Sequence, residues 1–353
     1  MAKEKVETPK ETNDKILESF IKDIEKTYGQ GSVMKLDDKP AANLDVIPTG
    51  SLLLDNALGV GGYPVGRIIE IYGPESAGKS TLALAAAAEC QKLGKRVAYV
   101  DSEHSINPVY AKMMGVNLKD VVLSQPDYGE QALDIVEKMA NSGLFGLIIV
   151  DSVAALVPKA ELDGEMGDQN VGLHARLMSR AMRKLTPAFS RGNCVGIFVN
   201  QIREKVGVMY GNPEVTTGGK ALKFFSTIRI EVRRGDYIKK GADTIGNIVK
   251  VKIVKNKVAP PFKSCEFNII YGQGIDKYGE VVELAIKRGV IQKSGSWLSY
   301  NGEKLCQGSA NAVARAKNDE SFYNELVEKI AKAPVIDDET GEVLMDDETP
   351  SEE

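Results

Sequence analysis

The stretch GPESAGKS, from Gly73 to Ser80, constrains the fold of this chain more than any other feature. Before it, RIIEIYG (67–73) is an apolar run typical of a buried strand, and after it TLALAAAAECQKL (81–93) is typical of a helix. A strand, a glycine-rich turn and a helix start with lysine and serine between them make a phosphate-binding loop. The alternative is a glycine-serine turn before an ordinary helix.

This loop predicts binding of a nucleoside triphosphate and Mg²⁺. Its glycines allow backbone N–H groups to face phosphate oxygens, and the helix N-terminus adds partial positive charge. Lys79 would contact the β- and γ-phosphates, and Ser80 or Thr81 would hold Mg²⁺ through a hydroxyl. The predicted nucleotide-binding residues of the loop are Gly73, Pro74, Glu75, Ser76, Ala77, Gly78, Lys79, Ser80 and Thr81.

Three further apolar runs end in polar residues: RVAYVD (96–101), GLIIVD (146–151) and CVGIFVNQ (194–201). Continuous apolar runs suit parallel strands buried on both faces, and ligands of such sheets lie beyond the carboxyl ends of the strands. Asp151 then suits a Mg²⁺ site, Glu103 would orient or deprotonate water, and Gln201 would sense the γ-phosphate. The alternative for each of these residues, taken singly, is an ordinary polar residue that ends a strand at the surface.

Composition indicates a globular protein with one large domain and one or two small ones. The chain has 353 residues, of which 43% are hydrophobic and 27% charged. The sequence has no apolar run of about twenty residues and no apolar segment near its start, so we expect neither a membrane span nor a secretory signal. Four scattered cysteines without a C-x-x-C pair argue against a zinc site or a disulfide framework, and free thiols fit the cytoplasm.

Four regions follow from patterning. Residues 1–40 hold an amphipathic helix (14–30) and a linker, and 41–276 form the core, whose VKVKIVKNK segment predicts an exposed, antiparallel strand. Residues 277–335 predict a small α+β domain, and 336–353 an acidic disordered tail. Nine acidic residues and no Lys or Arg lie in 337–353, so the other 336 residues have a net charge of +5, against −4 for the whole chain. The tail either only aids solubility or masks a basic surface and competes with an anionic ligand.

Two segments suggest nucleic acid rather than a small substrate. ELDGEMGDQNVGL (161–173) precedes a helix (174–191) that holds five cations and no acid. We expect these cations to lack compensation, which makes a costly face unless an anion binds. The segment 202–223, directly after Gln201, is too long for a plain connector. It has a glycine pair that can bind phosphate, several basic residues and the apolar stretch 206–209, which would wedge between bases of single-stranded nucleic acid. Contact of Gln201 with ATP would order this segment.

Lys255 and Lys257 are two residues apart in VKNKVAPPF (254–262), so on a strand both would point to one side. They either belong to an exposed strand end or contact ATP across a subunit interface, in the manner of arginine fingers.

Five ordered blocks together resemble the bacterial RecA recombinases: GPESAGKST, VDSEHSINP, LIIVDSVAALVPKAELDGEMGD, VNQIREKVGVMYGNPEVTTGGKALKF and VKNKVAPPF. The resemblance covers roughly residues 10–335. It implies a P-loop ATPase core with a mostly parallel sheet, an N-terminal helix and a small α+β C-terminal domain. It also implies a cytoplasmic protein that forms helical filaments on single-stranded DNA, binds ATP and Mg²⁺ at subunit interfaces, exchanges strands with a homologous duplex and promotes self-cleavage of LexA-type repressors.

The resemblance also assigns residues. The catalytic set would be Glu103, Lys79, Gln201, Lys255 and Lys257, with Ser80 and Asp151 at the metal and Tyr110, Tyr271 and Asn107 near the base of ATP. The DNA-binding set would be Arg176, Ser179, Arg183, Val171, Arg203, Val206, Thr217, Gly218 and Gly219, in and beside two loops (164–172 and 202–217). Phe224 and the N-terminal helix would be subunit contacts.

Three residues depart from the commonest family pattern: Asn107 stands where many members have Asp, Val171 replaces a bulkier Met, and Glu204 puts an acid in the second loop. None of them belongs to the catalytic set. Rival readings are a ring-forming helicase motor, a RadA-like relative that would add a cysteine zinc motif, a non-catalytic ATP-binding scaffold and a small-molecule P-loop kinase. Glu103 argues against the scaffold, and 202–223 argues against the kinase.

Overall fold

The computed structural model describes residues 9–29, 32–33, 44–165, 172–204, 213–333, 335–336 and 343–344. It divides into two compact units, 1–45 and 46–353, which are described separately. The first unit holds the helix α1 (Pro9–Tyr28), which begins five residues earlier than the predicted start at residue 14. Proline is tolerated in a first helical turn because its missing N–H would have no partner there. Ile16, Phe20 and Ile24 are spaced by four residues and therefore share one face of α1.

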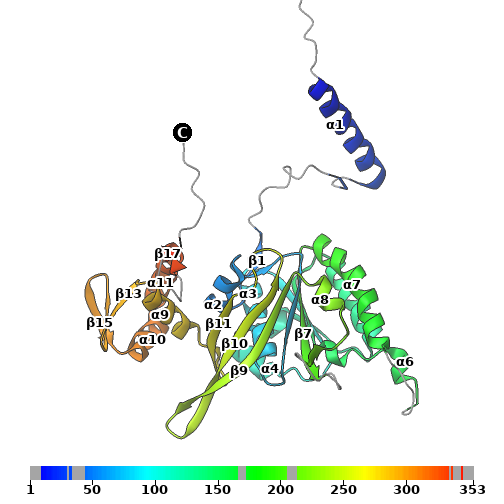
Figure 1. Ribbon diagram of the computed structural model, residues 1–353. Helices are drawn as coiled ribbons and strands as arrows, with labels where there is room; N and C mark the ends of the chain where they lie inside the picture. Colours follow the sequence, from blue (N-terminus) through cyan, green and yellow to red (C-terminus); the bar gives the residue numbers. More distant parts are fainter. Residues whose placement is uncertain are drawn as a thin grey trace, which may run out of the picture. The chain divides into compact units, whose positions relative to one another are not determined.

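A ten-stranded sheet, built from described residues, organises the second unit (Figure 1). The strand order is β12-β11-β10-β9-β3-β7-β6-β4-β5, and β8 pairs with β7. Neighbouring strands from β9 to β5 run parallel, as the apolar runs predicted. Their bounds are β3 (Ile68–Gly73), β4 (Arg96–Asp101), β5 (Val121–Ser124), β6 (Phe145–Asp151), β7 (Val195–Glu204) and β9 (Ile228–Lys240).

Helices cover both faces of this sheet, because alternate strand residues point to opposite sides. Ile69 and Ile71 of β3 pack in one apolar core with α2 (Leu52–Leu58) and α3 (Lys79–Lys92). Ile148 and Val150 of β6 pack in a second core with α5 (Gly129–Asn141) and α7 (Leu173–Arg191). Short elements complete this part: β1 (Val46–Ile47), β2 (Tyr63–Pro64), α4 (Pro108–Met113), α6 (Lys159–Leu162), and the 3-10 turns Leu118–Asp120 and Val153–Ala155.

The other side of the sheet is antiparallel. β10 (Asp243–Asn256) pairs antiparallel with β9 and with β11 (Ser264–Ile270), which confirms the prediction for VKVKIVKNK. β12 (Gly274–Ile275) pairs with β11 at the edge. The β9–β10 hairpin extends well beyond the neighbouring strands (Figure 1).

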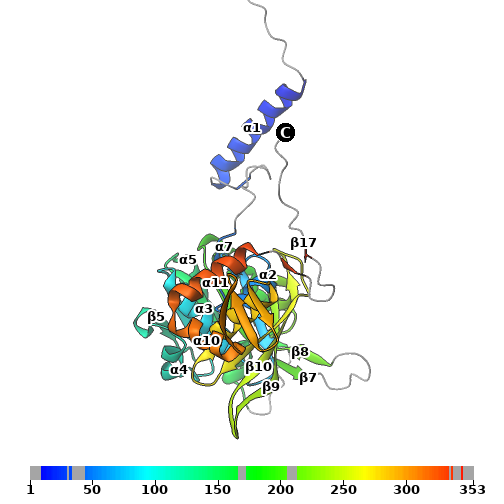
Figure 2. The same ribbon diagram turned by 90° about the vertical axis from the view of Figure 1, so that its left-hand side faces the viewer.

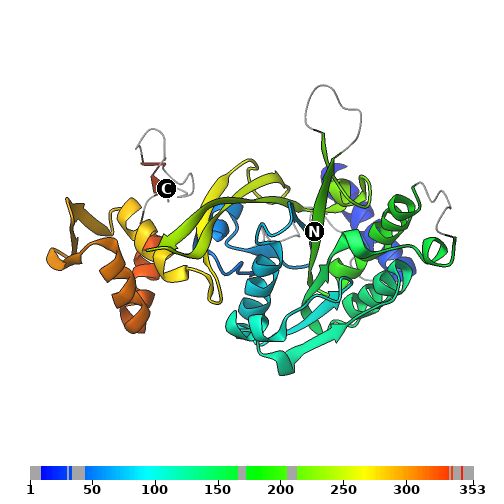
Figure 3. The ribbon, with the colours of Figure 1, turned by 90° about the horizontal axis from the view of Figure 1, so that it is seen from below.

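The C-terminal segment is α+β, as expected from the sequence. It contains α9 (Lys277–Lys287), a three-stranded antiparallel sheet, α10 (Ser309–Asn318) and α11 (Glu320–Lys332). The three strands are β13 (Ile291–Ser294), β14 (Trp297–Tyr300) and β15 (Glu303–Gln307). Figure 2 shows α10 and α11 beside each other, and Figure 3 shows this segment, in orange, at one end of the core. A two-stranded antiparallel sheet of β16 (Val335–Ile336) and β17 (Val343–Leu344) follows.

The segment after Gln201 is more regular than predicted. β7 continues to Glu204 and pairs antiparallel with β8 (Glu214–Thr216), and α8 (Ala221–Phe225) follows a turn at 217–220. The two ends of the expected loop, 202–204 and 214–216, therefore pair as antiparallel strands. This pairing gives hydrogen-bond partners to backbone N–H and C=O groups that a loop would leave to water. Across the part of the chain that the structure describes, we find no helix with the length and apolar character needed to cross a bilayer.

Candidate nucleotide-binding site and nucleic-acid interface

The turn between β3 and α3 requires glycine at both ends. A Cβ atom at Gly73 would lie 2.0 Å from the backbone oxygen of Val232 on β9. Gly78 has a φ of +100°, and a Cβ there would lie 2.9 Å from Ile269 Cδ1. The backbone therefore makes this turn at close range to its neighbours, and α3 begins directly after it at Lys79.

Lys79 is the first residue of α3, and its side chain reaches back into the preceding turn. Its Nζ donates a hydrogen bond to the backbone oxygen of Pro74 at 2.6 Å. Burial lowers the pKa of Lys79, whereas the nearby carboxylates Asp151, Glu103 and Glu75 raise it. A buried cation beside a glycine turn at a helix N-terminus is suited to hold an anion such as phosphate.

Oxygen groups from one helix and two strands meet beside Lys79. Ser80 Oγ and Tyr99 OH both donate to Asp151 Oδ2 at 2.7 Å. Burial raises the pKa of Asp151, and these two hydrogen bonds lower it. Hydroxyl and carboxylate oxygens are the ligands that Mg²⁺ prefers, so Ser80 and Asp151 fit the predicted metal site.

Glu103 lies just beyond the end of β4 and is held by two neighbours. Gln201 Nε2 on β7 donates to Glu103 Oε1 at 2.7 Å, and Ser152 Oγ, just after β6, donates to the same oxygen. The predicted base and the predicted sensor are thus in direct contact. Ser152 was absent from the predicted set, although its place directly after Asp151 at a strand end is a usable signal.

A cavity of about 360 Å³ opens next to the turn. It is lined by the turn residues 76–81 and by Tyr110 and Tyr271, two of the three residues predicted near the base. Thr81 Oγ1 and Tyr110 OH are hydrogen-bonded at 2.9 Å. Asn107 does not line this cavity. Its Oδ1 accepts from the backbone N–H groups of residues 109 and 110 and so caps the start of α4.

Three lining residues were missed by the sequence reasoning: Asn247, Ile269 and Gly272. They come from β10 and from the end of β11, about 170 residues or more after the P-loop. No local motif marks them, because pairing of distant strands brings them to the cavity.

The turn at 217–220 packs on the start of α7. Cβ atoms at Gly218 and Gly219, whose φ angles are +76° and +73°, would lie 3.0 Å from Met178 Cγ and 2.8 Å from Ala175 Cβ. The structure therefore brings the glycine pair close to Arg176 and Ser179, which come from the other predicted DNA-binding segment. Arg176, Arg183 and Arg203 are exposed, whereas Val171 and Val206 lie outside the described residues.

The expectation that the cations of α7 lack compensation is wrong in part. Lys184 Nζ lies 3.0 Å from Glu137 Oε2 of α5, and Arg191 donates to Asn141 Oδ1 at 3.1 Å. Glu137, which compensates the charge of Lys184, and Asn141, which only accepts a hydrogen bond from Arg191, both belong to α5, so the sequence of α7 alone does not reveal them. Arg176, Arg180 and Arg183 remain exposed on the surface of α7.

Lys255 and Lys257 differ in their surroundings. Lys255 Nζ donates to the backbone oxygens of Lys223 at 2.7 Å and Phe224 at 2.9 Å. Lys257 is exposed and lies just beyond the end of β10, so strand alternation does not describe the pair. Phe224, the predicted subunit contact, is also exposed.

A parallel sheet with a lysine-serine turn at one strand end, and carboxylates after the neighbouring strands, defines a P-loop nucleoside triphosphatase. Two family models identify the branch of this class: the RecA N-terminal domain matches residues 15–276, and the RecA C-terminal domain matches 279–334. The chain belongs to the RecA family.

Curated relatives agree over almost the whole chain. Protein RecA of Staphylococcus carnosus is 53% identical over 338 residues, which cover 96% of this chain and 95% of that protein. Protein RecA of Bacillus subtilis is 54% identical over 314 residues, covering 89% and 90% of the two chains. Protein RecA of Ruminococcus albus is 55% identical over 323 residues, covering 92% and 81%.

With this family come the enzyme class and the general function. The chain is a recombinase and a DNA-dependent ATPase of DNA repair and the SOS response, and it binds nucleotide and DNA. The assignment removes the small-molecule kinase and the non-catalytic scaffold.

Proposed function

We propose that this chain hydrolyses ATP with Mg²⁺ while it is polymerised on single-stranded DNA, and that the filament pairs this strand with a homologous duplex. The observation that carries the proposal is the contact between Gln201 Nε2 and Glu103 Oε1 at 2.7 Å, beside the P-loop. Gln201 begins the segment that leads to the Thr217–Gly219 turn. Glu103 is the carboxylate that would orient and deprotonate the attacking water. Nucleotide chemistry and DNA binding would therefore meet at these two side chains.

In this mechanism, the backbone of residues 73–79 and Lys79 bind the phosphates, and Tyr110 and Tyr271 contact the base. Ser80 and Asp151 would hold Mg²⁺, which when bound neutralises charge that develops on the phosphates. Glu103 orients a water molecule and accepts its proton. Gln201, which now donates to Glu103, would turn its amide to the γ-phosphate and release the carboxylate for that role.

DNA binding would use the surface where the turn at 217–220 meets α7. Backbone N–H groups of Gly218 and Gly219 and the exposed side chains of Arg176 and Arg183 are donors for phosphate oxygens. Arg203, on the exposed end of β7, would extend this surface along the hairpin. Such contacts are independent of base sequence, as pairing of arbitrary homologous strands requires.

A second copy of this chain would complete each ATP site. Among the described residues of unit 1–45, α1 is the only helix or strand, so its apolar face has no partner within that unit. We assign α1 and Phe224 to contacts between copies, and Lys255 and Lys257 to the ATP bound by a neighbouring copy. A cytoplasmic location and promotion of self-cleavage in a LexA-type repressor complete the proposed function.

The proposal is tested by measuring ATP hydrolysis without DNA, with single-stranded DNA and with duplex DNA at one fixed salt concentration. We expect strong stimulation by single strands, with filaments in electron micrographs. The fixed salt matters because binding to phosphates weakens steeply as salt rises. Hydrolysis that does not respond to DNA would contradict the link between the P-loop and the 202–223 segment.

The role of Glu103 has its own test. Glu103→Gln keeps the size of the side chain and its hydrogen bonding, but removes the group that accepts a proton. Loss of a general base typically costs about 10²–10⁴-fold in rate. We therefore expect the DNA-stimulated rate to fall by about this factor while binding of a fluorescent ATP analogue is retained. Normal hydrolysis by this variant would mean that another group is the base.

A further inference from the structure

A buried ion pair lies in the centre of the sheet, beneath the P-loop. Glu70 of β3 is 0% exposed, and its Oε2 accepts from Arg229 Nε of β9 at 2.5 Å. The two residues are paired in register on adjacent parallel strands, and the guanidinium lies 4.6 Å from the centre of the Tyr72 ring. Burying two charges costs free energy that a pair of apolar residues would not, so this pair is poorly explained as a source of stability alone.

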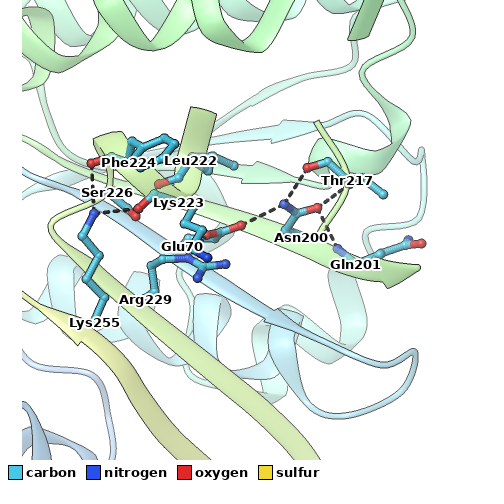
Figure 4. Close-up of polar contacts among 10 residues, drawn as sticks. All are labelled: Glu70, Asn200, Gln201, Thr217, Leu222, Lys223, Phe224, Ser226, Arg229 and Lys255. Carbon is cyan, nitrogen blue, oxygen red and sulfur yellow. Dashed lines mark hydrogen bonds and ion pairs between the residues drawn. The ribbon is translucent and has the colours of Figure 1, made fainter. Parts of the chain in front are cut away.

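The ion pair supports a second buried group, Asn200 of β7, as Figure 4 shows. Asn200 is also 0% exposed, and its Nδ2 donates to Glu70 Oε1 at 2.9 Å and to the backbone oxygen of Thr217 at 3.1 Å. Its Oδ1 accepts from the backbone N–H of Gln201 at 2.8 Å and from Thr217 Oγ1. Both donors and both acceptor positions of the amide are therefore in use.

Thr217 is consequently fastened to the end of β7 from several sides. Besides its two bonds to Asn200, its backbone N–H donates to the oxygen of Gln201 at 3.3 Å. Residues 200 and 201 thus hold the first residue of the turn that carries Gly218 and Gly219. A shift of Gln201 toward bound nucleotide would pull on this turn directly.

The turn is followed directly by α8, and two backbone carbonyl groups of α8 bind the side chain of Lys255. Ala221 and Leu222 of this short helix are buried, and the backbone oxygens of Lys223 and Phe224 accept from Lys255 Nζ (Figure 4). Burial, together with the nearby cations Lys257 and Arg229, lowers the pKa of Lys255 to about 8. The lysine is therefore held at the end of α8 by two backbone carbonyl groups, and a further anion beside it would favour its charged form.

We propose that Asn200 is a positioning residue for the ATPase reaction. Anchored on the Glu70–Arg229 pair, it locks Thr217 to β7, so that Gln201, the Thr217–Gly219 turn and α8 with Lys255 move as one body. This proposal rests on the proposed function. It adds that the hydrogen bonds between Asn200 and Thr217 transmit DNA binding to the nucleotide site. It is the placement of the cluster, between the sensor and the turn, that distinguishes it from a purely structural network.

Replacing Asn200 itself risks unfolding, since four groups on Glu70, Gln201 and Thr217 would each lose a hydrogen-bond partner. Thr217 offers a milder test. Thr217→Val keeps the shape of the side chain and removes only the hydroxyl that donates to Asn200, whereas Thr217→Ser keeps this hydroxyl. Thr244→Val, at an exposed position of the β9–β10 hairpin, is the matched control for loss of a threonine hydroxyl.

ATP hydrolysis is then measured over a range of poly-dT concentrations. One lost hydrogen bond of about 1 kcal/mol corresponds to a rate change of about fivefold. We expect Thr217→Val to lower the maximal rate at saturating DNA by about this factor, without raising the half-saturating DNA concentration. Thr217→Ser, which keeps the hydroxyl, should recover most of the maximal rate that Thr217→Val loses, and Thr244→Val should match the unmodified chain.

Two results would overturn the inference. A maximal rate in Thr217→Val equal to that of the unmodified chain would mean that the lock does not transmit DNA binding. A rise in the half-saturating DNA concentration alone would mean that Thr217 simply contacts DNA.

Hydrogen exchange separates this inference from the proposed function, because it needs no ATPase activity. Without DNA or nucleotide, the amides of residues 214–223 should exchange faster in Thr217→Val than in Thr217→Ser or the unmodified chain. Equal exchange in all three would refute the lock. An unmodified chain whose hydrolysis ignores DNA would refute the proposed function instead, and the exchange comparison would still decide whether the lock exists.

Discussion

At the scale of single residues, the Glu70–Arg229 pair permits a test of stability. Glu70→Gln leaves the Arg229 guanidinium buried without a counter-charge, so we expect the free energy of unfolding to fall by about 3–5 kcal/mol. The double variant Glu70→Gln/Arg229→Met should regain much of this loss, because an apolar side chain needs no counter-charge. Unfolding in urea measures both values.

The chain offers a matched control for this prediction. Lys250 and Glu266 form a pair at 3.3 Å, and both side chains are more than half exposed. Water screens such a pair, and Glu266→Gln should change the free energy of unfolding by less than about 1 kcal/mol. Losses of similar size in Glu70→Gln and Glu266→Gln would show that burial of the first pair has no special energetic weight.

The sequence allowed the roles of some site residues to be predicted and not those of others. Glu103, Asp151 and Gln201 could be predicted as strand-end residues because continuous apolar runs mark parallel strands, and the carboxyl ends of such strands meet at one edge. Asn200 stands next to Gln201 but received no role, because its partners Glu70 and Thr217 lie far away in the sequence. Buried polar networks depend on strand order, which local patterns do not contain.

At the scale of elements, the start of α2 is tied to α9 through a buried carboxyl group. Glu280 of α9 is 3% exposed and accepts from Ser51 Oγ at 2.8 Å and from the backbone N–H of Leu52 at 2.9 Å. Burial raises the pKa of Glu280 to about 8, and burial also raises the pKa of Asp55 to about 7. The contact between these two helices should therefore depend on pH.

The direction of this pH dependence follows from the number of protons bound in the folded and unfolded states. Because the folded-state pKa of Glu280 lies above its unfolded value of about 4.5, the folded chain binds more protons between these two pH values. Its contribution to stability is fully present below about pH 4.5 and is lost as pH rises toward 8. We expect the urea midpoint to decline over this window in the unmodified chain, and to decline less in Glu280→Gln.

The control for this prediction is Glu283→Gln, at an exposed position of α9. It should keep the pH dependence of the unmodified chain. At pH 5, Glu280→Gln should be the less stable protein by about 1 kcal/mol, because its amide nitrogen cannot accept from Leu52 N–H. Parallel urea curves for all three proteins from pH 5 to 8.5 would rule out Glu280 as the titrating group.

Long, strongly patterned elements were the predictable ones, and short polar ones were not. The strands β3, β4, β6 and β7 begin within one residue of the predicted positions. In contrast, α10 was missed because its buried residues are the small Ala312 and Ala316, which give weak apolar periodicity. β13 and β15 were also missed, since mostly exposed strands lack apolar alternation.

At the scale of the whole molecule, family membership and assembly decide the function. The P-loop alone predicted only a nucleotide-binding fold, whereas five ordered blocks spread over the chain identified the family that the comparisons confirm. In the proposed function, a second copy would contribute Lys255 and Lys257 to each ATP site. Assembly is thus the remaining step between this single chain and the proposed reaction.

α1 gives the means to test that step. Its face with Ile16, Phe20 and Ile24 is apolar, and burial of a phenylalanine side chain against a neighbouring copy is worth about 1.5–3 kcal/mol. Phe20→Asp should therefore raise the protein concentration needed for filament assembly on poly-dT by at least about tenfold, as followed by light scattering. Lys22→Ala, a polar position of the same helix, should leave assembly unchanged. If Phe20→Asp assembles at the concentration of the unmodified chain, α1 does not form the contact between copies, and the completion of the ATP site must rest on another surface.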